Sequence, residues 1–301
     1  MSRQKQHLTI GLIATMLMAM DVSAAPPATA TSDAKPFANA AHDPYTLALR
    51  ATIWGYPMVR AAQLREKATQ PQNPFAPRPA TVATAPLNRL GLARALSDSD
   101  TRIGVAPNND TLYLLDFVDT KDGPFLLETP DFGSRYYIFQ FGEADSSTLH
   151  SYGQGTHGAK LPPIAVVAPD YKGQVPKGAI IVRSQQRYMM IAGRILVKGE
   201  SDLPTVHALQ DKVTVRRWLG TGRTVEAPVS AQPVLAGTNG DAPAGLKLLA
   251  DLGTVLKDWR PAPDEAGLVP SALRVGAAFN MPRSRPPCAQ KWSAALPTDC
   301  A

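Results

Sequence analysis

The chain has 301 residues, of which 44% are hydrophobic and 19% are charged, a composition typical of a folded globular protein rather than a disordered or fibrous one. Lysine and arginine number 31 against 25 aspartate and glutamate residues, and the resulting net charge of +6 is spread along the chain. This spread argues against nucleic-acid binding, and no apolar run reaches the roughly 20 residues that a membrane-spanning helix needs.

The N-terminus shows the regions of a secretory signal peptide in their usual order. Arg3 and Lys5 are basic, residues 8–20 are apolar, and small residues lead up to Ala24. We therefore expect residues 1–24 to be a signal peptide that is cleaved after Ala24, and the protein to be periplasmic or secreted. A buried N-terminal helix is the alternative, but it does not require these three regions in this order.

The two cysteines, Cys288 and Cys300, lie close together near the C-terminus. In an oxidising compartment we expect them to form a disulfide that holds the tail, residues 278–301. Two free thiols are the alternative. Neither the spacing of the cysteines nor their neighbours indicates a metal site.

The first folded element is predicted to be a helix. Residues 25–42 are rich in Ala, Pro and Thr without hydrophobic periodicity, so we expect a flexible leader there. Asp43 and Pro44 then form a helix start, and apolar residues recur at helical spacing after them. Pro57 predicts that this helix kinks or breaks after Tyr56.

From about Ile103 the hydrophobic pattern changes to short segments that are rich in β-branched and aromatic residues and are separated by turn residues. Strands that follow one another without intervening helices predict a mainly β fold, an antiparallel sandwich or jelly roll with peripheral helices. We assign residues 43–219 to this domain. The predicted strands are 111–119, 124–130, 135–143, 164–169, 179–184 and 188–197.

Further segments follow the strands. Asp202 and its neighbour Ser201 are predicted to cap a helix. Residues 220–244 have the composition of a linker, and residues 245–277 carry apolar residues three and four apart, which indicates a helical segment.

A literal G-x-G-x-x-G occurs at residues 153–158. Nucleotide binding through this motif requires a helix directly after the glycines, and Pro162-Pro163 argues against one. We therefore interpret the motif as a loop between strands and expect no nucleotide cofactor; no other cofactor is identified.

His150 and His157 are weak metal candidates. They share the glycine-rich segment, with Glu143 and Asp145 just upstream. Imidazole and carboxylate groups suit a divalent ion, but this spacing matches no established ligand pattern, so no metal site is assigned.

Three polar residues, Asn108, Asn109 and Asp110, run directly into the apolar strand at 111–119. Such residues commonly satisfy backbone groups at a turn, and the residues alone favour that role. A carboxylate with two amides at the mouth of a strand is also suited to hold a ligand or to orient a water molecule.

Three motifs together resemble a bacterial family, domain of unknown function 1254: Trp54-Gly55-Tyr56-Pro57, Pro107 to Tyr113, and Arg135-Tyr136-Tyr137. The resemblance extends over about residues 43–277. It implies a sandwich of jelly-roll type with helices at its edges, and usually a second sandwich, domain of unknown function 1214, which we do not expect in this chain. The family's name assigns no activity.

One position departs from the family pattern. Between Asn88 and Arg94 the family often carries a histidine, and this chain has Leu92 there. If that histidine serves a metal or a proton transfer in relatives, this chain lacks the group.

Two functions follow as hypotheses. The first is a non-catalytic or weakly catalytic protein that binds a small molecule or an envelope partner. The alternative is a periplasmic hydrolase-like enzyme that works with or without a metal ion. In it Asp110 is the base or a metal ligand, and Arg135 stabilises negative charge. Convergence of Asp110 and Arg135 with His150 or His157 in one pocket would favour the enzyme. The predicted ligand-binding residues are Asn108, Asn109, Asp110, Tyr113, Arg135 and Tyr137.

A third hypothesis, a subunit of an assembly, would require a wide exposed apolar face. The sequence leaves the oligomeric state open.

Overall fold

The computed structural model describes residues 44–71, 78–101, 107–240 and 242–265, together with residues 268, 269 and 272. The predicted signal peptide with its cleavage after Ala24, the leader and the Cys288–Cys300 disulfide lie outside the described residues. Within the described part of the chain, no helix has the length and apolar character that crossing a membrane requires.

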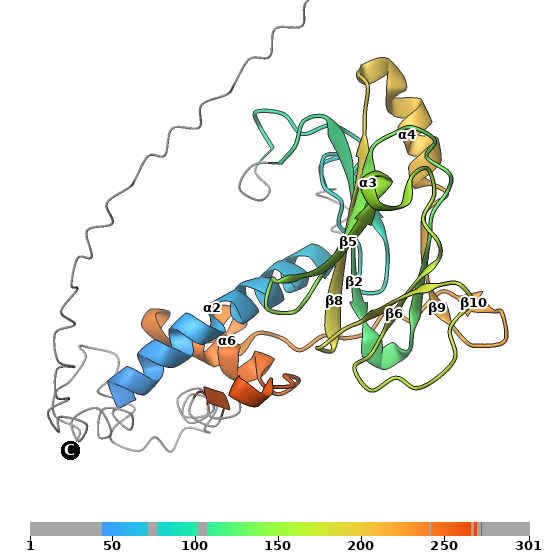
Figure 1. The fold of residues 1–301 in the computed structure, drawn as a ribbon. Helices are drawn as coiled ribbons and strands as arrows, with labels where there is room; N and C mark the ends of the chain where they lie inside the picture. The colour runs from blue at the N-terminus through green and yellow to red at the C-terminus, as the bar shows by residue number, and fades with distance from the viewer. Residues whose placement is uncertain are drawn as a thin grey trace, which may run out of the picture. The chain divides into compact units, whose positions relative to one another are not determined.

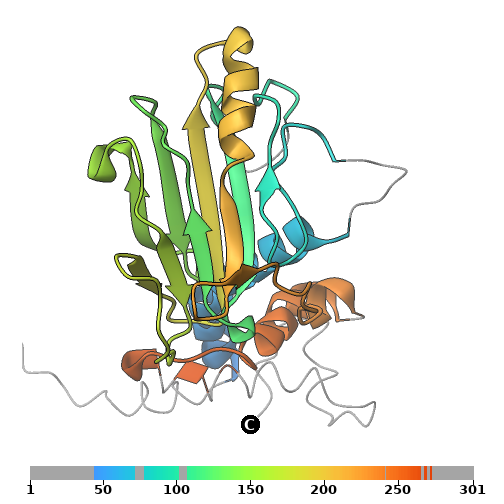
Figure 2. The same ribbon diagram turned by 90° about the vertical axis from the view of Figure 1, so that its right-hand side faces the viewer.

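Two five-stranded sheets face each other (Figure 1, Figure 2). The first has the order β1-β2-β8-β4-β5 and comprises β1 (Gly91–Leu92), β2 (Thr111–Asp119), β8 (Tyr188–Leu196), β4 (Tyr137–Gly142) and β5 (Thr148–Gly153). The second has the order β10-β9-β3-β6-β7 and comprises β10 (Thr224–Val225), β9 (Thr214–Trp218), β3 (Phe125–Glu128), β6 (Ile164–Val167) and β7 (Ile180–Arg183).

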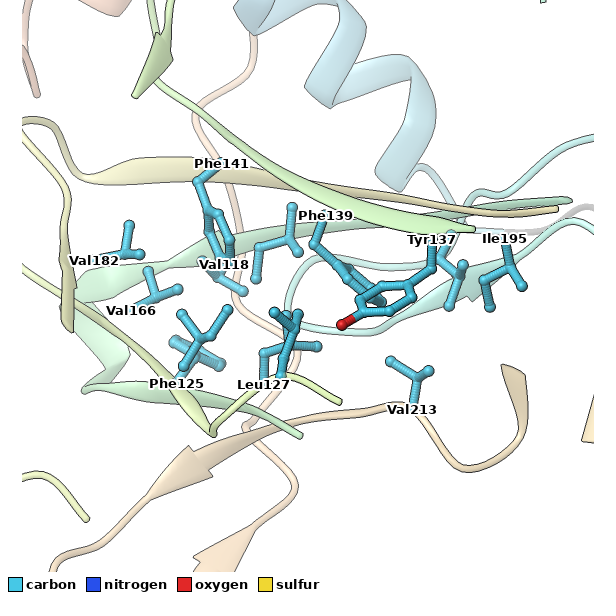
Figure 3. Close-up of a cluster of buried hydrophobic side chains, with 14 of the residues drawn as sticks. Val118, Phe125, Leu127, Tyr137, Phe139, Phe141, Val166, Val182, Ile195 and Val213 are labelled. Carbon is cyan, nitrogen blue, oxygen red and sulfur yellow. The ribbon is translucent and has the colours of Figure 1, made fainter. Parts of the chain in front are cut away.

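Alternation of side chains along the strands produces the core between the sheets. Phe139 and Phe141 of β4 point toward Phe125 and Leu127 of β3 (Figure 3), and all four are at most 1% exposed. Tyr137, at the start of β4, lies in the same cluster. Fully burying a side chain of this size stabilises a fold by roughly 1.5–3 kcal/mol.

The prediction of a mainly β fold with helices is confirmed in outline, and it is wrong in one respect. Strands β6 and β7 are parallel, with Ile164 opposite Ile180, whereas all other pairs are antiparallel. The strand orders do not identify a jelly roll, which stays a prediction. Strands β5 and β9 were not predicted because their residues are mostly only partly buried or exposed, so their patterns are weakly apolar.

Helix α2 (Pro44–Thr69) packs against α6 (Lys247–Val255) through Met58, Val59 and Leu252. The predicted break at Pro57 does not occur, because α2 continues through it. Because Pro57 has no backbone N–H, the carbonyl of Ile53 has no helical hydrogen-bond donor. Ile53 is 69% exposed, so water can reach this carbonyl. A Cβ at Gly55 would lie 2.5 Å from the Leu252 side chain, so this glycine permits the close approach of the two helices.

The C-terminal end of α2 covers the outer face of the first sheet, where Ala68 packs with Phe117 and Tyr188. The remaining helices are short. They are α3 (Gln154–His157), α4 (Leu203–Gln210) and α5 (Ala236–Asn239), with 3-10 turns η1 (Thr120–Asp122), η2 (Glu200–Asp202), η3 (Ala244–Leu246) and η4 (Pro263–Glu265).

Residues 220–244, expected to be a linker, contain β10 and α5 and bury Ala227 and Leu235. Asp202 stands at the predicted N-cap position of α4, but its side chain makes no capping hydrogen bond. Its carboxylate is engaged elsewhere, as described below.

Candidate functional site

At the start of β2 the predicted polar residues serve the turn. The backbone N–H of Asn108 donates to the Tyr113 hydroxyl at 2.7 Å, and the Asn108 side-chain amide lies 3.5 Å from Thr111 Oγ1. The backbone carbonyl of Asp110 accepts from the N–H of Val197 at 2.8 Å. Asn109 and Asp110 are exposed. The structure therefore brings Asn108 and Tyr113 together through a hydrogen bond from the Asn108 backbone.

Arg135 is held by another acidic residue. Its Nη2 donates to Asp202 Oδ1 at 2.8 Å, and its Nη1 donates to the second carboxylate oxygen and to the Leu196 carbonyl. The Arg135 guanidinium holds the pKa of Asp202 at about 2, and the backbone N–H of Lys198 adds to this effect. Within the described part of the chain, Arg135 forms no ion pair with Asp110.

Tyr137 is part of the core. It is 0% exposed, its ring stacks on Phe132 with centroids 4.1 Å apart, and its hydroxyl donates to the Gly158 carbonyl at 3.0 Å. Burial raises the pKa of this hydroxyl. None of the six predicted ligand-binding residues lines the cavities described below.

The prediction that the two histidines share a loop is wrong. They lie instead on either side of the Tyr152 ring. His150 lies on β5 and stacks on Tyr152 at 5.6 Å between centroids, while His157 in α3 meets the same ring edge-on at 5.5 Å. No group of three metal-ligating side chains occurs among the described residues. The segment 153–158 begins with the last residue of β5 and includes the four-residue helix α3.

The segment from Asn88 to Arg94 holds its polar groups in place. Asn88 donates to Asp122 at 2.9 Å, and Leu92 packs against the core. Arg94 forms an exposed ion pair with Asp211. These contacts give the segment a structural role.

The opposite end of β2 and β8 carries a different arrangement. There Asp119, the last residue of β2, lies opposite Tyr188, the first residue of β8. Arg187 precedes Tyr188, and Arg65 reaches the same point from α2. Both guanidinium groups lie against the Tyr188 ring, Arg65 at 3.7 Å and Arg187 at 4.8 Å from its centroid.

Arg187 is fully matched by carboxylates. Its Nε and Nη2 donate to both oxygens of Asp119 at 2.9 and 2.6 Å, and its Nη1 donates to Asp258 at 2.9 Å. The bond to Asp119 raises the pKa of Arg187 further above its usual value. This triad joins β2, β8 and the end of α6.

Arg65 has no such partner. It is 7% exposed, its Nε donates to Gln232 Oε1 at 3.0 Å, and within the described residues it forms no ion pair and no further side-chain hydrogen bond. Burial lowers the pKa of Arg65, and Tyr188 and Asp119 oppose that effect. A buried cation without an adjacent anion is unusual, because its desolvation is not compensated by an ion pair.

The Tyr188 hydroxyl is an unsatisfied donor at this point. Tyr188 is 6% exposed, and its hydroxyl has no hydrogen-bond partner among the described residues. Burial raises the pKa of Tyr188 to about 12, so the hydroxyl keeps its proton at neutral pH.

Arg65 and Tyr188 line one small cavity of about 20 Å³, together with Arg187 and Asp258. A volume of this size holds about one water molecule or a comparably small group. Apolar side chains from α2, α6 and the segment before α5 complete the wall; they are Met58, Ala62, Pro233, Leu235, Val255 and Trp259.

Two larger clefts differ from this cavity because their principal polar groups have partners. In the first, of about 620 Å³, Arg78 donates to Thr84 and Asp98 accepts from Thr101. In the second, of about 490 Å³, Glu143 accepts from Ser184 and from the backbone N–H of Gln185.

One more buried group lies between the two ends of β2. Asp116 is 1% exposed, and neither of its carboxylate oxygens has a hydrogen-bond partner among the described residues. Burial raises its pKa to about 8, against a smaller opposing effect of Arg89. Asp116 lines none of the three cavities.

The residues of the Arg65 cavity were not predicted from the sequence. A usable signal existed, because Arg65 follows Met58 and Ala62 by seven and three residues and so shares their buried helix face. A cation on an apolar helix face is a recognisable exception to amphipathic patterning.

Comparisons with known proteins identify a family for part of the chain. Residues 87–217 match the family model described as "Protein of unknown function (DUF1254)". The resemblance stated from the motifs is thus confirmed over these residues. A search of curated proteins found no match.

Two solved structures are similar to this chain. The VPA0106 protein from Vibrio parahaemolyticus is 18% identical with a TM-score of 0.53, and the match covers 79% of this chain and 58% of that one. An uncharacterised protein from Burkholderia cenocepacia is 13% identical with a TM-score of 0.28, covering 78% of this chain and 51% of that one. The first likeness shows the fold alone. This chain spans just over half the length of either protein.

Proposed function

Starting from the DUF1254 domain that residues 87–217 form, we propose that this protein binds a small molecule in the Arg65 cavity and does not act on it chemically. The observation that carries the proposal is the buried Tyr188 hydroxyl, which has no acceptor among the described residues and lines one cavity together with the Arg65 guanidinium, which forms no ion pair there. The ligand is therefore a hydrogen-bond acceptor.

Burying a donor without an acceptor costs free energy, because the donor loses its hydrogen bonds to water. Leaving a buried donor unsatisfied costs about 1–3 kcal/mol, and more for a charged group. Folded proteins satisfy nearly all such groups, and an exception calls for a water, an ion or a ligand. A ligand that accepts from both donors recovers this free energy on binding.

Binding without catalysis fits the chemistry of the cavity wall. Arginine stays protonated in proteins, and Tyr188 has a pKa of about 12, so neither exchanges a proton readily near neutral pH. Asp258, the carboxylate at the cavity, is held by Arg187 at 2.9 Å.

The hydrolase alternative receives less support. It requires Asp110 and Arg135 to act together, yet the Arg135 guanidinium is bound to Asp202. The N-terminal sequence pattern supports a periplasmic or secreted location for the binding function. An envelope protein as an alternative partner stays a prediction.

Native mass spectrometry of the protein purified under non-denaturing conditions tests the proposed function. We expect a bound small molecule on the wild-type protein that is absent from Arg65→Met. Arg94→Met is the matched control, since Arg94 lies in an exposed ion pair away from the cavity. A ligand retained by Arg65→Met, or none on the wild-type protein in the cell's own extract, would contradict the proposal.

A further inference from the structure

We propose that helix α2 docks on the surface of a lipid bilayer that carries anionic headgroups. The contact is made by four apolar side chains in one row on the exposed face of the helix, the α2 stripe, which consists of Tyr45, Leu49, Ile53 and Tyr56. Three features support this partner: the exposed apolar row, the basic residues beside it and its limited area. The binding goes beyond the proposed function, because the Arg65 cavity lies on a buried face of the helix.

Helix α2 is apolar on two faces. One face carries Ala51, Met58 and Val59, which are at most 4% exposed and pack against α6, beside α2 in Figure 1. The members of the α2 stripe follow one another at intervals of four, four and three residues, a spacing that places side chains in one row on a helix. They are 46–69% exposed. Single exposed apolar residues are common on protein surfaces, but a continuous row indicates a contact surface.

The charged groups beside the α2 stripe are cationic. Arg50 and Arg60 are exposed, and neither forms an ion pair with a described residue. Glu66 is the one acidic residue in the sequence of α2, and its carboxylate accepts from the Asn239 side chain. A basic residue close to an anionic membrane surface strengthens binding about fivefold. An apolar row beside arginines therefore fits the boundary between acyl chains and anionic headgroups, which the guanidinium groups can reach.

The docking surface is confined to the part of α2 from residue 45 to residue 60. Beyond it, Leu64 and Lys67 line the cleft of about 620 Å³ together with Asp98 and Asp100. These two carboxylates offset the charge of Lys67, so the C-terminal end of the helix does not share the cationic character of the α2 stripe.

The area of the α2 stripe favours a bilayer over a protein partner. Each of its side chains exposes roughly 100 Å², about half of what an aromatic residue buries in a core, which gives about 400 Å² for the row. Each partner in a stable protein–protein interface contributes about 800 Å². A second copy docked on the same face would also bring Arg50 and Arg60 of both chains together without a carboxylate from either stripe. A bilayer surface conforms to a single apolar row, and tyrosine rings are suited to the headgroup level.

Vesicle flotation tests the inference. The chain from residue 25 onward is used, the form expected after cleavage of the signal peptide, because the apolar residues 8–20 would bind vesicles by themselves. The vesicles consist of phosphatidylcholine alone or with about one third phosphatidylglycerol. We expect at least tenfold tighter binding to the anionic vesicles, and added salt should weaken that binding.

Ile53→Glu places a negative charge in the α2 stripe at a position that is 69% exposed, so the fold should be retained. It should weaken binding to the anionic vesicles at least tenfold. Ile181→Glu is the matched control, because Ile181 is 50% exposed on β7 of the second sheet, and it should leave binding nearly unchanged.

A second pair of variants tests the cationic residues. Arg50→Gln combined with Arg60→Gln should weaken binding to the anionic vesicles at least tenfold and leave phosphatidylcholine vesicles unaffected. Arg216→Gln combined with Arg223→Gln removes the same net charge from exposed positions outside α2 and should have a much smaller effect. Equal losses in the two double variants would show that net charge alone binds the vesicles, and the assignment to α2 would be wrong.

Three further outcomes would overturn the proposal. The first is the absence of binding to anionic vesicles, and the second is undiminished binding by Ile53→Glu. The third is a protein in place of the bilayer. It would be seen as a dimer that Ile53→Glu dissociates in analytical ultracentrifugation, or as one cross-linked protein when a photoreactive amino acid replaces Leu49, in either case without vesicle binding. The proposed function in the Arg65 cavity is tested separately and stands or falls independently of these results.

Discussion

The two ends of strands β2 and β8 accommodate arginines in opposite ways. At one end Arg135 is bound bidentately by Asp202. At the other end Arg65 lies against Tyr188, and no carboxylate of the described residues forms an ion pair with it. The ends are about 26 Å apart along the eight steps of β2 from Thr111 to Asp119. The same residue type thus serves structure at one end and leaves unused hydrogen-bonding capacity at the other.

This difference shows how a structural arginine can be told from a binding arginine. A charge whose partners are all supplied by the protein stabilises the fold and has little left to offer a ligand. A charge with unsatisfied donors beside a cavity reduces stability until a ligand arrives. The following variants test the distinction, from the largest expected effect to the smallest.

Asp116→Asn tests a third case, a buried carboxyl group whose oxygens have no hydrogen-bond partner among the described residues, and it should stabilise the protein at pH 7. The folded-state pKa of about 8 lies above the usual value of 3.8, so the unfolded chain releases its proton first as the pH rises. Wild-type stability is therefore lost between about pH 4 and 8, and the amide avoids this loss. Each unit of pKa difference corresponds to about 1.4 kcal/mol, which gives a gain of the order of 4 kcal/mol at pH 7.

Urea denaturation at pH 4, 5.5 and 7 measures this effect, which should shrink toward zero at pH 4. Asp110→Asn, at an exposed position, is the control and should show no such pH dependence. A gain that does not change with pH would contradict the ionisation argument.

Arg135→Met should lower the free energy of unfolding by about 2–3 kcal/mol, because it leaves the largely buried Asp202 without its cation. Arg65→Met should change it by less than about 1 kcal/mol, since no ion pair is broken and a desolvated charge is removed. Urea denaturation of both variants, without added ligand, gives the comparison directly. Equal losses would show that Arg65 is as structural as Arg135.

Two tyrosines allow the same comparison with neutral groups. Tyr137→Phe removes a hydroxyl that donates to the Gly158 carbonyl and should cost about 1 kcal/mol. Tyr188→Phe removes a hydroxyl without a partner and should change stability by less than about 0.5 kcal/mol. Thermal unfolding of the two variants measures the difference, and a larger loss in Tyr188→Phe would reverse the interpretation.

The smallest effect is expected at the exposed pair of Arg94 and Asp211, whose side chains are 36% and 58% exposed. Asp211→Ala should cost no more than about 0.5 kcal/mol, and added salt should reduce that cost further. Urea denaturation at low and high salt checks this value. A loss comparable to that of Arg135→Met would show that exposure does not separate the two pairs.

Prediction from the sequence succeeded where a local pattern sufficed. The segment 111–119 is strand β2 with the same bounds, because its β-branched and aromatic residues are nearly all buried. The six predicted strands each contain an observed one. The weakly apolar edge strand β5 was taken for a loop, since exposed strands show little hydrophobic alternation.

The site predicted from the sequence lies at the end of β2 opposite the Arg65 cavity, and its residues are engaged within the fold. Arg135 and Tyr137 carry the right chemistry, but their hydrogen-bonding groups are satisfied by residues that are distant in sequence, such as Asp202 at a separation of 67 residues. Local sequence does not show which acceptors the fold will bring. The position of Arg65 on the same helix face as Met58 is a local signal for an unusual cation. The absence of an ion pair to Arg65 among the described residues cannot be read from the local sequence.

The sequence by itself determined the β-rich class of the fold, its helices and the DUF1254 assignment over residues 87–217, because each depends on residue periodicity or motif order. Tertiary structure alone decided which buried charges are matched. Burial and pairing depend on contacts between remote segments. Those contacts place Asp202 beside Arg135, and among the described residues they leave Arg65 without an ion pair and the Tyr188 hydroxyl without an acceptor at one cavity.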